Sequence, residues 1–195
     1  MRNINSFNRI VIKIGSAVLA GTSGRVNNSI LASISEDIAW LLKNNKEVLI
    51  VSSGAIALGR KQIKFSEKPS LAESQALAAH GQIELMSAWK KHFKKFSIPI
   101  GQILLTPRDT ELKISSKNAK QTVSKLLAAG CLPIINENDS TATDEIRFGD
   151  NDLLAAKVAK LIGADLLIVL STVDGLFSSK EDVETSKLSS MIREV

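Results

Sequence analysis

The densest group of polar side chains that could do chemistry lies in the second half of the sequence. It begins with Asn-Glu-Asn-Asp at residues 136–139, continues with Asp-Glu at residues 144–145 and ends with Gly-Asp-Asn-Asp at residues 149–152. Carboxylate and amide oxygens can bind Mg²⁺, accept hydrogen bonds from a substrate ammonium group or orient a catalytic lysine. Turn and capping roles are typical of Asp and Asn, and we expect Asp150 or Asn151 to cap the next helix. These roles do not account for the whole group, which therefore predicts a functional loop.

A single lysine interrupts the first apolar run of the chain. Lys13 lies in Arg-Ile-Val-Ile-Lys-Ile at residues 9–14 and is followed by Gly15 and Ser16. Burying an ammonium group is unfavourable unless an anion meets it, which indicates a phosphate contact. The alternative is a lysine at the strand end whose ammonium group extends to water. Residue chemistry alone leaves both open, and the small residues that follow favour phosphate because they permit close approach to the backbone.

A second turn of small residues, Ser-Ser-Gly-Ala at residues 52–55, joins an apolar run to a helix-like segment. The N–H groups at such a helix start can bind an anion or a carboxylate, and the alternative is plain N-capping by serine. Residues 54–61 do not form a P-loop, because Arg60 and Lys61 stand where Lys and then Ser or Thr are required. The motifs of dinucleotide-binding folds and of hydrolase elbows are missing from the sequence.

Short apolar runs alternate with segments of helical period, and these elements must position the polar residues. The runs are nearly continuous and rich in β-branched residues, as in strands that are covered on both faces. The alternation predicts an α/β fold with a mainly parallel central sheet and helices on both faces. Ligands bind at the carboxyl ends of such strands, where most of the small and polar residues fall. The expected strands are residues 9–14, 47–52, 99–105, 132–136 and 165–170, and the expected helices are residues 28–43, 55–60, 70–96 (one helix, or two broken near Gly81), 113–129 and 151–162.

The composition is that of one globular domain of 195 residues, with 44% hydrophobic and 23% charged residues. A net charge of +5 suits anionic ligands, and 4% aromatic residues without any Tyr argue against a nucleic-acid partner. The one cysteine, Cys131, excludes an intrachain disulfide and is expected to be a buried, inert thiol. Apolar stretches stay below about 18 residues, so we expect a cytoplasmic protein with no membrane partner.

Four motifs resemble the amino acid kinase family, and the middle two resemble its glutamate 5-kinase branch in particular. The match runs from Arg9 to the end of the chain in the order of the family. The first motif alone is typical of the whole family, and the last resembles the strand and loop that hold an adenine nucleotide. The motifs are residues 11–16, residues 51–56 with Gly59 and Arg60, residues 136–139 with 148–152, and residues 170–177.

The resemblance implies a three-layer α/β/α sandwich over residues 1–195 and ATP-dependent phosphorylation of the side-chain carboxylate of L-glutamate, the first step of proline synthesis. ATP and Mg²⁺ are the implied cofactors, and we expect a homo-oligomer. By position, the implied catalytic residues are Lys13 and Asp152, the glutamate-binding residues are Ser53, Gly54, Asp139 and Asn151, and the nucleotide-binding residues are Lys13, Gly15, Ser16, Ser171 and Thr172, with none assigned to a metal.

The sequence departs from the family pattern at its end. Kinase domains of the family continue into a glycine-rich segment with a second lysine, and this chain stops at Val195, about where that segment would begin. We therefore expect a truncated kinase domain with an incomplete ATP site and no second domain. The alternatives are a kinase of the same family for carbamate, acetylglutamate, aspartate or a nucleotide, and a remnant that binds glutamate and nucleotide without turnover. A nucleic-acid-binding module is a more distant alternative.

Overall fold

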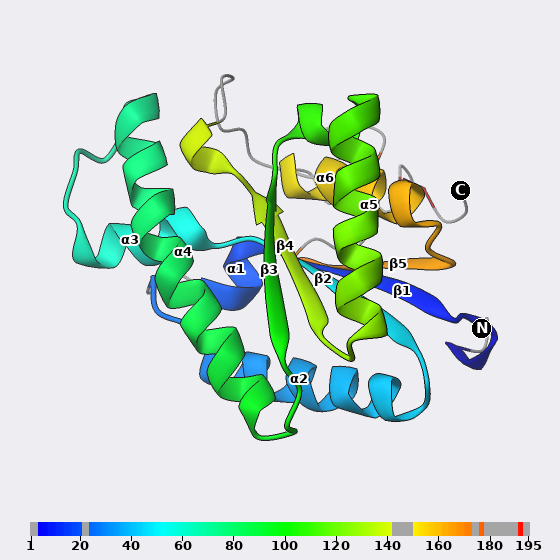
Figure 1. Cartoon of the computed structure of the whole chain (residues 1–195). Coiled ribbons are helices and arrows are strands. Elements are labelled where there is room, and N and C mark those ends of the chain that lie inside the picture. Colours follow the sequence, from blue (N-terminus) through cyan, green and yellow to red (C-terminus); the bar gives the residue numbers. More distant parts are fainter. Residues whose placement is uncertain (1–3, 21–23, 142–149, 173–175, 178–190, 193–195) are drawn as a thin grey trace.

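The computed structural model describes residues 4–20, 24–141, 150–172, 176–177 and 191–192, and it contains a central sheet of five parallel strands in the order β3-β4-β2-β1-β5 (Figure 1). The predicted α/β fold with a mainly parallel sheet is therefore confirmed. The strands are β1 (Arg9–Ile14), β2 (Glu47–Ser52), β3 (Ile100–Leu105), β4 (Leu132–Glu137) and β5 (Leu166–Leu170), and a separate antiparallel pair is formed by β6 (Leu176–Phe177) and β7 (Met191–Ile192).

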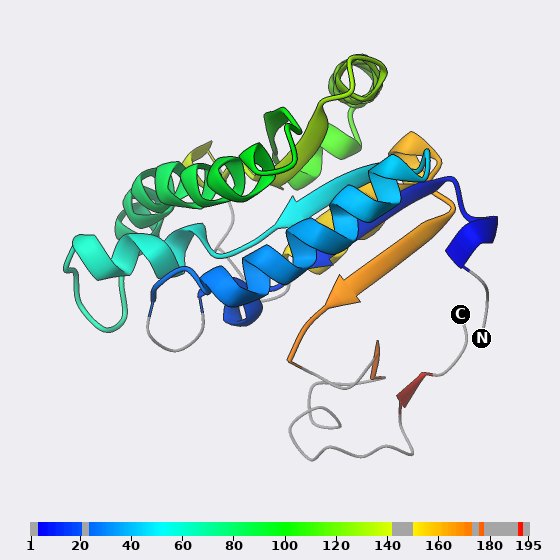
Figure 2. The same ribbon diagram turned by 90° about the horizontal axis from the view of Figure 1, so that it is seen from below.

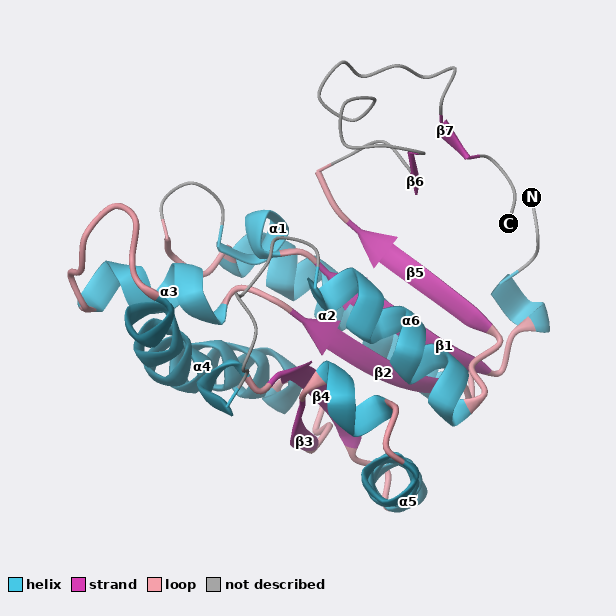
Figure 3. Ribbon diagram, turned by 90° about the horizontal axis from the view of Figure 1, so that it is seen from above, coloured by secondary structure: helices cyan, strands magenta, loops and turns pink. Residues whose placement is uncertain are grey.

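Helices cover both faces of the sheet and bury two apolar cores. Ile10, Ile12 and Ile14 of β1 point into one core, and Val11 points into the other. Figure 2 shows α2 (blue) in front of the sheet, and Figure 3, seen from the opposite side, shows α6 there. The first core is covered by α1 (Ser16–Ala20), α2 (Asn28–Lys43), α3 (Ala55–Gln62) and α4 (Leu71–Lys94), the second by α5 (Lys113–Ala128) and α6 (Asp150–Ile162), and short 3₁₀ turns are η1 (Ile4–Ser6), η2 (Pro107–Thr110) and η3 (Asp139–Thr141).

The helix boundaries follow local capping signals. Ser70 and Glu73 form a capping box at the start of α4, in which the Ser70 hydroxyl accepts from the Glu73 N–H and the Glu73 carboxylate accepts from the Ser70 N–H. Gly130 and Gly163 follow α5 and α6 with a left-handed φ of 68°. The expectation that Asp150 or Asn151 caps α6 is wrong, because the helix begins at Asp150 and includes both residues. None of the helices in the described part of the chain is both long and apolar enough to cross a bilayer.

Helix α4 runs unbroken through Gly81, so the alternative of two helices is wrong. A Cβ atom at Gly81 would overlap the backbone carbonyl of Ala55, and one at Gly59 would overlap the carbonyl of Leu77. Both glycines therefore serve the close contact between α3 and α4 rather than a bend. This contact fixes the position of α4 relative to α3.

Asp165 ties the first strand to the edge strand β5 at their amino ends. Its Oδ2 accepts hydrogen bonds from the backbone N–H groups of Asn8 and Arg9 at 2.8 and 2.9 Å, and its own N–H donates to the Arg9 carbonyl at 2.8 Å. The bond from the Arg9 N–H, and then the bond from the Asn8 N–H, hold the pKa of Asp165 below its usual value. The carboxylate therefore helps to set the register between β1 and β5.

We predict that Gly81→Ala lowers the free energy of unfolding by more than about 2 kcal/mol, because the added methyl group displaces the backbone of α3. Ser87→Ala, at an exposed position of the same helix, is the control and should change it by less than about 0.5 kcal/mol. Urea denaturation of the three proteins measures both values. A Gly81→Ala protein as stable as the control would contradict the close packing of α3 and α4.

We predict that Asp165→Asn lowers the melting temperature at pH 7 and that the difference from the unsubstituted chain disappears at acidic pH. The pKa of Asp165 is lower in the folded chain than in the unfolded chain, where it is about 3.9. Its stabilising effect is therefore present above about pH 5 and is lost as the pH falls through the folded pKa. Thermal unfolding between pH 7 and pH 3, with the exposed Asp37→Asn as control, tests this. A difference that stays constant over this range speaks against the carboxylate as its cause.

Candidate functional site

The predicted site residues gather at the carboxyl edge of the sheet. Figure 3 shows the arrowheads of β2 and β5 pointing to the same side, toward α1 and α3. This edge is where parallel sheets bind ligands, because backbone groups and turns from several strands converge there. Gly15 and Ser16 follow β1, Ser53 and Gly54 follow β2, Asp139 follows β4, and Ser171 and Thr172 follow β5.

The ammonium group of Lys13 is buried and meets a carboxylate of helix α6. The Lys13 side chain is 7% exposed, and its Nζ lies 2.6 Å from Oδ1 of Asp152, whose side chain is 51% exposed. The alternative of a lysine that extends to water is therefore wrong. The ion pair is therefore buried at its lysine and half-exposed at its carboxylate.

Gly15 lies directly beside this ion pair and places no side chain against it. A Cβ atom at this residue would stand 3.6 Å from Lys13 Nζ and 3.4 Å from the carbonyl oxygen of Leu170. The Gly15 N–H donates to that same carbonyl at 3.0 Å, which fixes the turn after β1 against the end of β5. The turn thus combines a cation with an uncrowded backbone, and this arrangement fits a phosphate group.

The turn after β2 holds its two serines in different roles. Gly54 is the N-cap residue of α3, with a left-handed φ of 105° and no side-chain cap. The Ser52 hydroxyl accepts a hydrogen bond from the Trp89 indole at 3.1 Å, and the Ser53 hydroxyl accepts one from Nδ2 of Asn151 at 2.8 Å. The alternative of N-capping by serine is therefore wrong. The start of α3 keeps its N–H groups without a side-chain acceptor of its own, as an anion site requires.

An amide network connects this turn to the interior. Nδ2 of Asn151 also donates to Oδ1 of Asn136 at 3.2 Å, and Nδ2 of Asn136 donates to Oε1 of Gln82 at 2.7 Å. Oδ1 of Asn151 and Nε2 of Gln82 are buried and have no hydrogen-bond partner among the described residues. Buried polar atoms are nearly always paired, so each of these atoms indicates a place for a ligand atom or water.

Gln82 is the residue of this network that the sequence did not reveal. It lies in the middle of α4, where a glutamine is a common helix residue without special meaning. Its spacing from the buried residues Ala78 and Leu85, four before and three after, places it on the buried face of the helix. This spacing is the signal in the sequence from which the role of Gln82 could have been predicted.

The other predicted site residues share the edge with these pairs. Asp139 lies in η3, which packs against α4, and it is partly exposed, as are Gly15 and Ser16. Ser171 and Thr172 are exposed. The direct contacts established among predicted site residues are Lys13 with Asp152 and Ser53 with Asn151. Asp144, Glu145 and residues 148–149 of the acidic loop, and residues 173–175, lie outside the described part of the chain.

Within the described residues, no group of three or more His, Cys, Asp or Glu side chains could hold a metal ion by itself. Mg²⁺ in phosphate-transfer sites is usually held by one or two carboxylates together with the substrate phosphates. Asp152 is a half-exposed carboxylate next to Lys13, so the side chains at this edge fit such a shared Mg²⁺ site.

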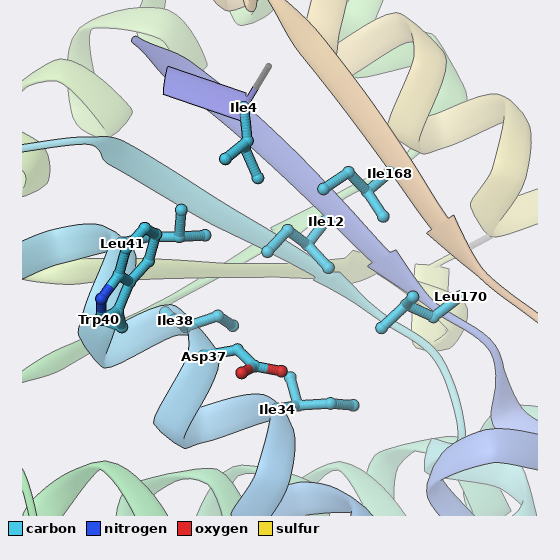
Figure 4. Close-up of a pocket in the computed structure, with 9 residues that line it drawn as sticks. All are labelled: Ile4, Ile12, Ile34, Asp37, Ile38, Trp40, Leu41, Ile168 and Leu170. Atoms are coloured by element: carbon cyan, nitrogen blue, oxygen red, sulfur yellow. The ribbon is translucent and has the colours of Figure 1, made fainter. Parts of the chain in front are cut away.

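Cys131 and an apolar hollow lie apart from the carboxyl edge. Cys131 is partly buried, and burial raises the pKa of its thiol, as expected for an inert cysteine. A hollow of about 310 Å³ lies between α2 and the face of β1 and β5 that α2 covers (Figure 4). Its walls are mostly apolar, with Ile12, Ile34 and Leu170 facing one another and Asp37 as a charged lining residue, and it contains none of the predicted site residues.

Comparison with known proteins places the chain in a family. The profile described as the amino acid kinase family matches residues 8–194. A protein named glutamate 5-kinase from Agrobacterium fabrum is 53% identical over 175 residues, covering 89% of this chain and 45% of the relative. Glutamate 5-kinases from Allorhizobium ampelinum and Pelagibacter ubique are both 48% identical, covering 100% and 95% of this chain and 50% and 51% of the relatives.

The chain thus spans about half the length of the curated relatives it matches. The family profile covers nearly all of the chain. The parallel sheet with its polar carboxyl edge agrees with this assignment. The chain belongs to the amino acid kinase family.

Proposed function

We propose that the chain binds ATP and L-glutamate and takes part in the glutamate 5-kinase reaction, in which the terminal phosphoryl group moves to the side-chain carboxylate of glutamate. The product would be L-glutamyl 5-phosphate, the first intermediate of proline synthesis. The observation that carries the proposal is that Asn151 and Asp152, adjacent in α6, contact Ser53 and the buried Lys13 respectively. The relatives named glutamate 5-kinase support the same reaction.

The nucleophile in this reaction needs no general base. A glutamate side chain has an ordinary pKa of about 4.3, so its carboxylate is already ionised at neutral pH. The difficulty is the repulsion between this anion and the anionic phosphoryl group. Catalysis then depends on positioning and on nearby positive charge.

Lys13 supplies positive charge in a place where water screens it little. Asp152 holds the ammonium group in one orientation, and the uncrowded turn at Gly15 and Ser16 lets phosphate oxygens come near it. Mg²⁺, when bound with the nucleotide, supplies further neutralisation of phosphate charge, and Asp152 is the carboxylate available for it. Ser171 and Thr172, at the end of β5, are proposed to contact the nucleotide.

The amino end of glutamate requires acceptor oxygens. The Oδ1 of Asn151, which lacks a partner among the described residues, is one, and the Asp139 carboxylate at the same edge is proposed as another. Ser53 and the N–H groups that follow Gly54 suit a carboxylate of the same substrate. Homo-oligomerisation, a cytoplasmic location and the extent of the kinase domain stay predictions from the sequence.

The direct test is glutamate-dependent release of ADP from ATP and Mg²⁺. It compares the 195-residue chain with the same chain continued by the part of the Agrobacterium fabrum relative that lies beyond its match. The continued chain should turn over on the order of 1 to 100 times per second with L-glutamate, and at least about tenfold more slowly with carbamate, acetylglutamate, aspartate or a nucleoside monophosphate. Absence of L-glutamate binding by calorimetry and of turnover in both proteins would reject the proposal.

We predict that Lys13→Ala in the continued chain lowers kcat on the order of 100-fold or more, because it removes a buried charge that acts on the transferred group. Lys157→Ala is the matched control, since Lys157 also pairs with a carboxylate, that of Glu111, at 2.6 Å, but it lies partly exposed on α6, the helix that carries Asp152. The control should keep kcat within about twofold of the unsubstituted protein. A near-normal kcat for Lys13→Ala would remove this lysine from the mechanism.

A further inference from the structure

Four side chains from four different elements form one chain of hydrogen bonds below the site. Gln82 comes from α4, Asn136 from β4, Asn151 from α6, and Ser53 from the turn after β2. The bonds run from Asn136 to Gln82 at 2.7 Å, from Asn151 to Asn136 at 3.2 Å, and from Asn151 to Ser53 at 2.8 Å. Three of the four groups are carboxamides, each with one donor end and one acceptor end.

A backbone group fixes the direction of this chain. The Glu137 N–H can only donate, and it donates to Oδ1 of Asn136 at 2.9 Å. The donor end of the Asn136 amide therefore faces Gln82, and Gln82 must present its oxygen in return. Asn136 is 2% exposed, so its N–H group has no access to bulk water as an alternative acceptor.

The same logic fixes the amide of Asn151. Its Nδ2 carries two hydrogens, which point to Oδ1 of Asn136 and to the Ser53 hydroxyl. Its Oδ1 therefore faces the other way, where it is buried and lacks a partner within the described residues. An atom that only accepts suits a group that only donates, and the ammonium group of an amino acid is such a group.

The packing of α4 against α3 holds Gln82 in place. It follows Gly81, whose missing side chain lets α4 lie against the backbone of α3, so the backbone at Gln82 has little room to shift. Its own Nε2 is buried without a partner among the residues that the structure describes. The side chain thus leaves one of its ends unsatisfied while the other supplies the acceptor that Asn136 needs.

We propose that Gln82 is a positioning residue for substrate recognition: through Asn136 it fixes the Asn151 amide with its oxygen toward the amino group of the substrate. This inference rests on the proposed function, because it assigns the donor to L-glutamate. Without the Gln82 oxygen, the N–H group of the buried Asn136 amide is left without an acceptor, so the Asn136 side chain is no longer held in the position from which it orients Asn151. The Asn151 oxygen would then no longer be held toward the substrate ammonium group.

The test compares L-glutamate with glutarate, which has the same two carboxylates and no amino group. Calorimetry gives the dissociation constants of both for the 195-residue chain, for Gln82→Met and for Gln121→Met, an exposed control on α5. Methionine keeps the length of the side chain and removes its hydrogen-bonding groups. We expect Gln82→Met to bind L-glutamate about tenfold or more weakly, with glutarate binding changed by less than about twofold. The Gln121→Met control should leave both dissociation constants unchanged.

Gln82→Glu is the second variant, because a carboxylate still offers an acceptor oxygen to Asn136. Gln82→Glu should keep a preference for L-glutamate over glutarate. If circular dichroism shows that Gln82→Met does not fold, the binding preference of Gln82→Glu tests the inference instead. Equal weakening of both ligands in Gln82→Met would indicate a structural role and overturn the inference. So would an unchanged preference in Gln82→Met, or a folded Gln82→Glu without preference. Failure of the unsubstituted chain to bind L-glutamate would instead overturn the proposed function, and with it the inference.

Discussion

The buried ammonium group of Lys13 constrains the whole carboxyl edge of the sheet. A charge inside an apolar strand is tolerated only where an opposite charge meets it, and Asp152 does so at 2.6 Å. The ion pair ties the first turn of α6 to β1. Because Asn151 precedes Asp152, the same turn also brings an amide to the ends of β2 and β4. One helix start thus connects a cationic region to a region of amide groups.

These two regions suit different ligand groups. The Lys13 side favours anions, since its positive charge is buried and the neighbouring Gly15 places no side chain beside it. The Asn151 side favours a donor, since the direction of its amide follows from a backbone N–H that cannot reverse. Fixed hydrogen-bonding directions of this kind discriminate well, because a mismatched ligand leaves a buried group unpaired.

The packing of α3 against α4 contributes to the same site from behind. Gly59 and Gly81 let the two helices approach until backbone meets backbone, so neither helix can move independently. Helix α3 starts after Gly54, in the turn that follows β2, and α4 carries Gln82 and the indole of Trp89, which bonds to Ser52. The stability of the fold and the proposed recognition of the substrate therefore both depend on the contact between α3 and α4. A substitution at Gly81 would weaken both.

The sequence by itself determined the strands, the helices and the sheet covered on both faces, because apolar runs and helical periods are local signals of burial. It also singled out Lys13 and Asn151 by residue type. Only the tertiary structure decided that Gly81 is a packing contact, that Asn151 reaches across to Ser53 rather than capping its helix, and that Gln82 joins the network. Those outcomes depend on which helix lies over which strand, and this is set by the packing of the whole sheet in the order β3-β4-β2-β1-β5, which no local pattern encodes.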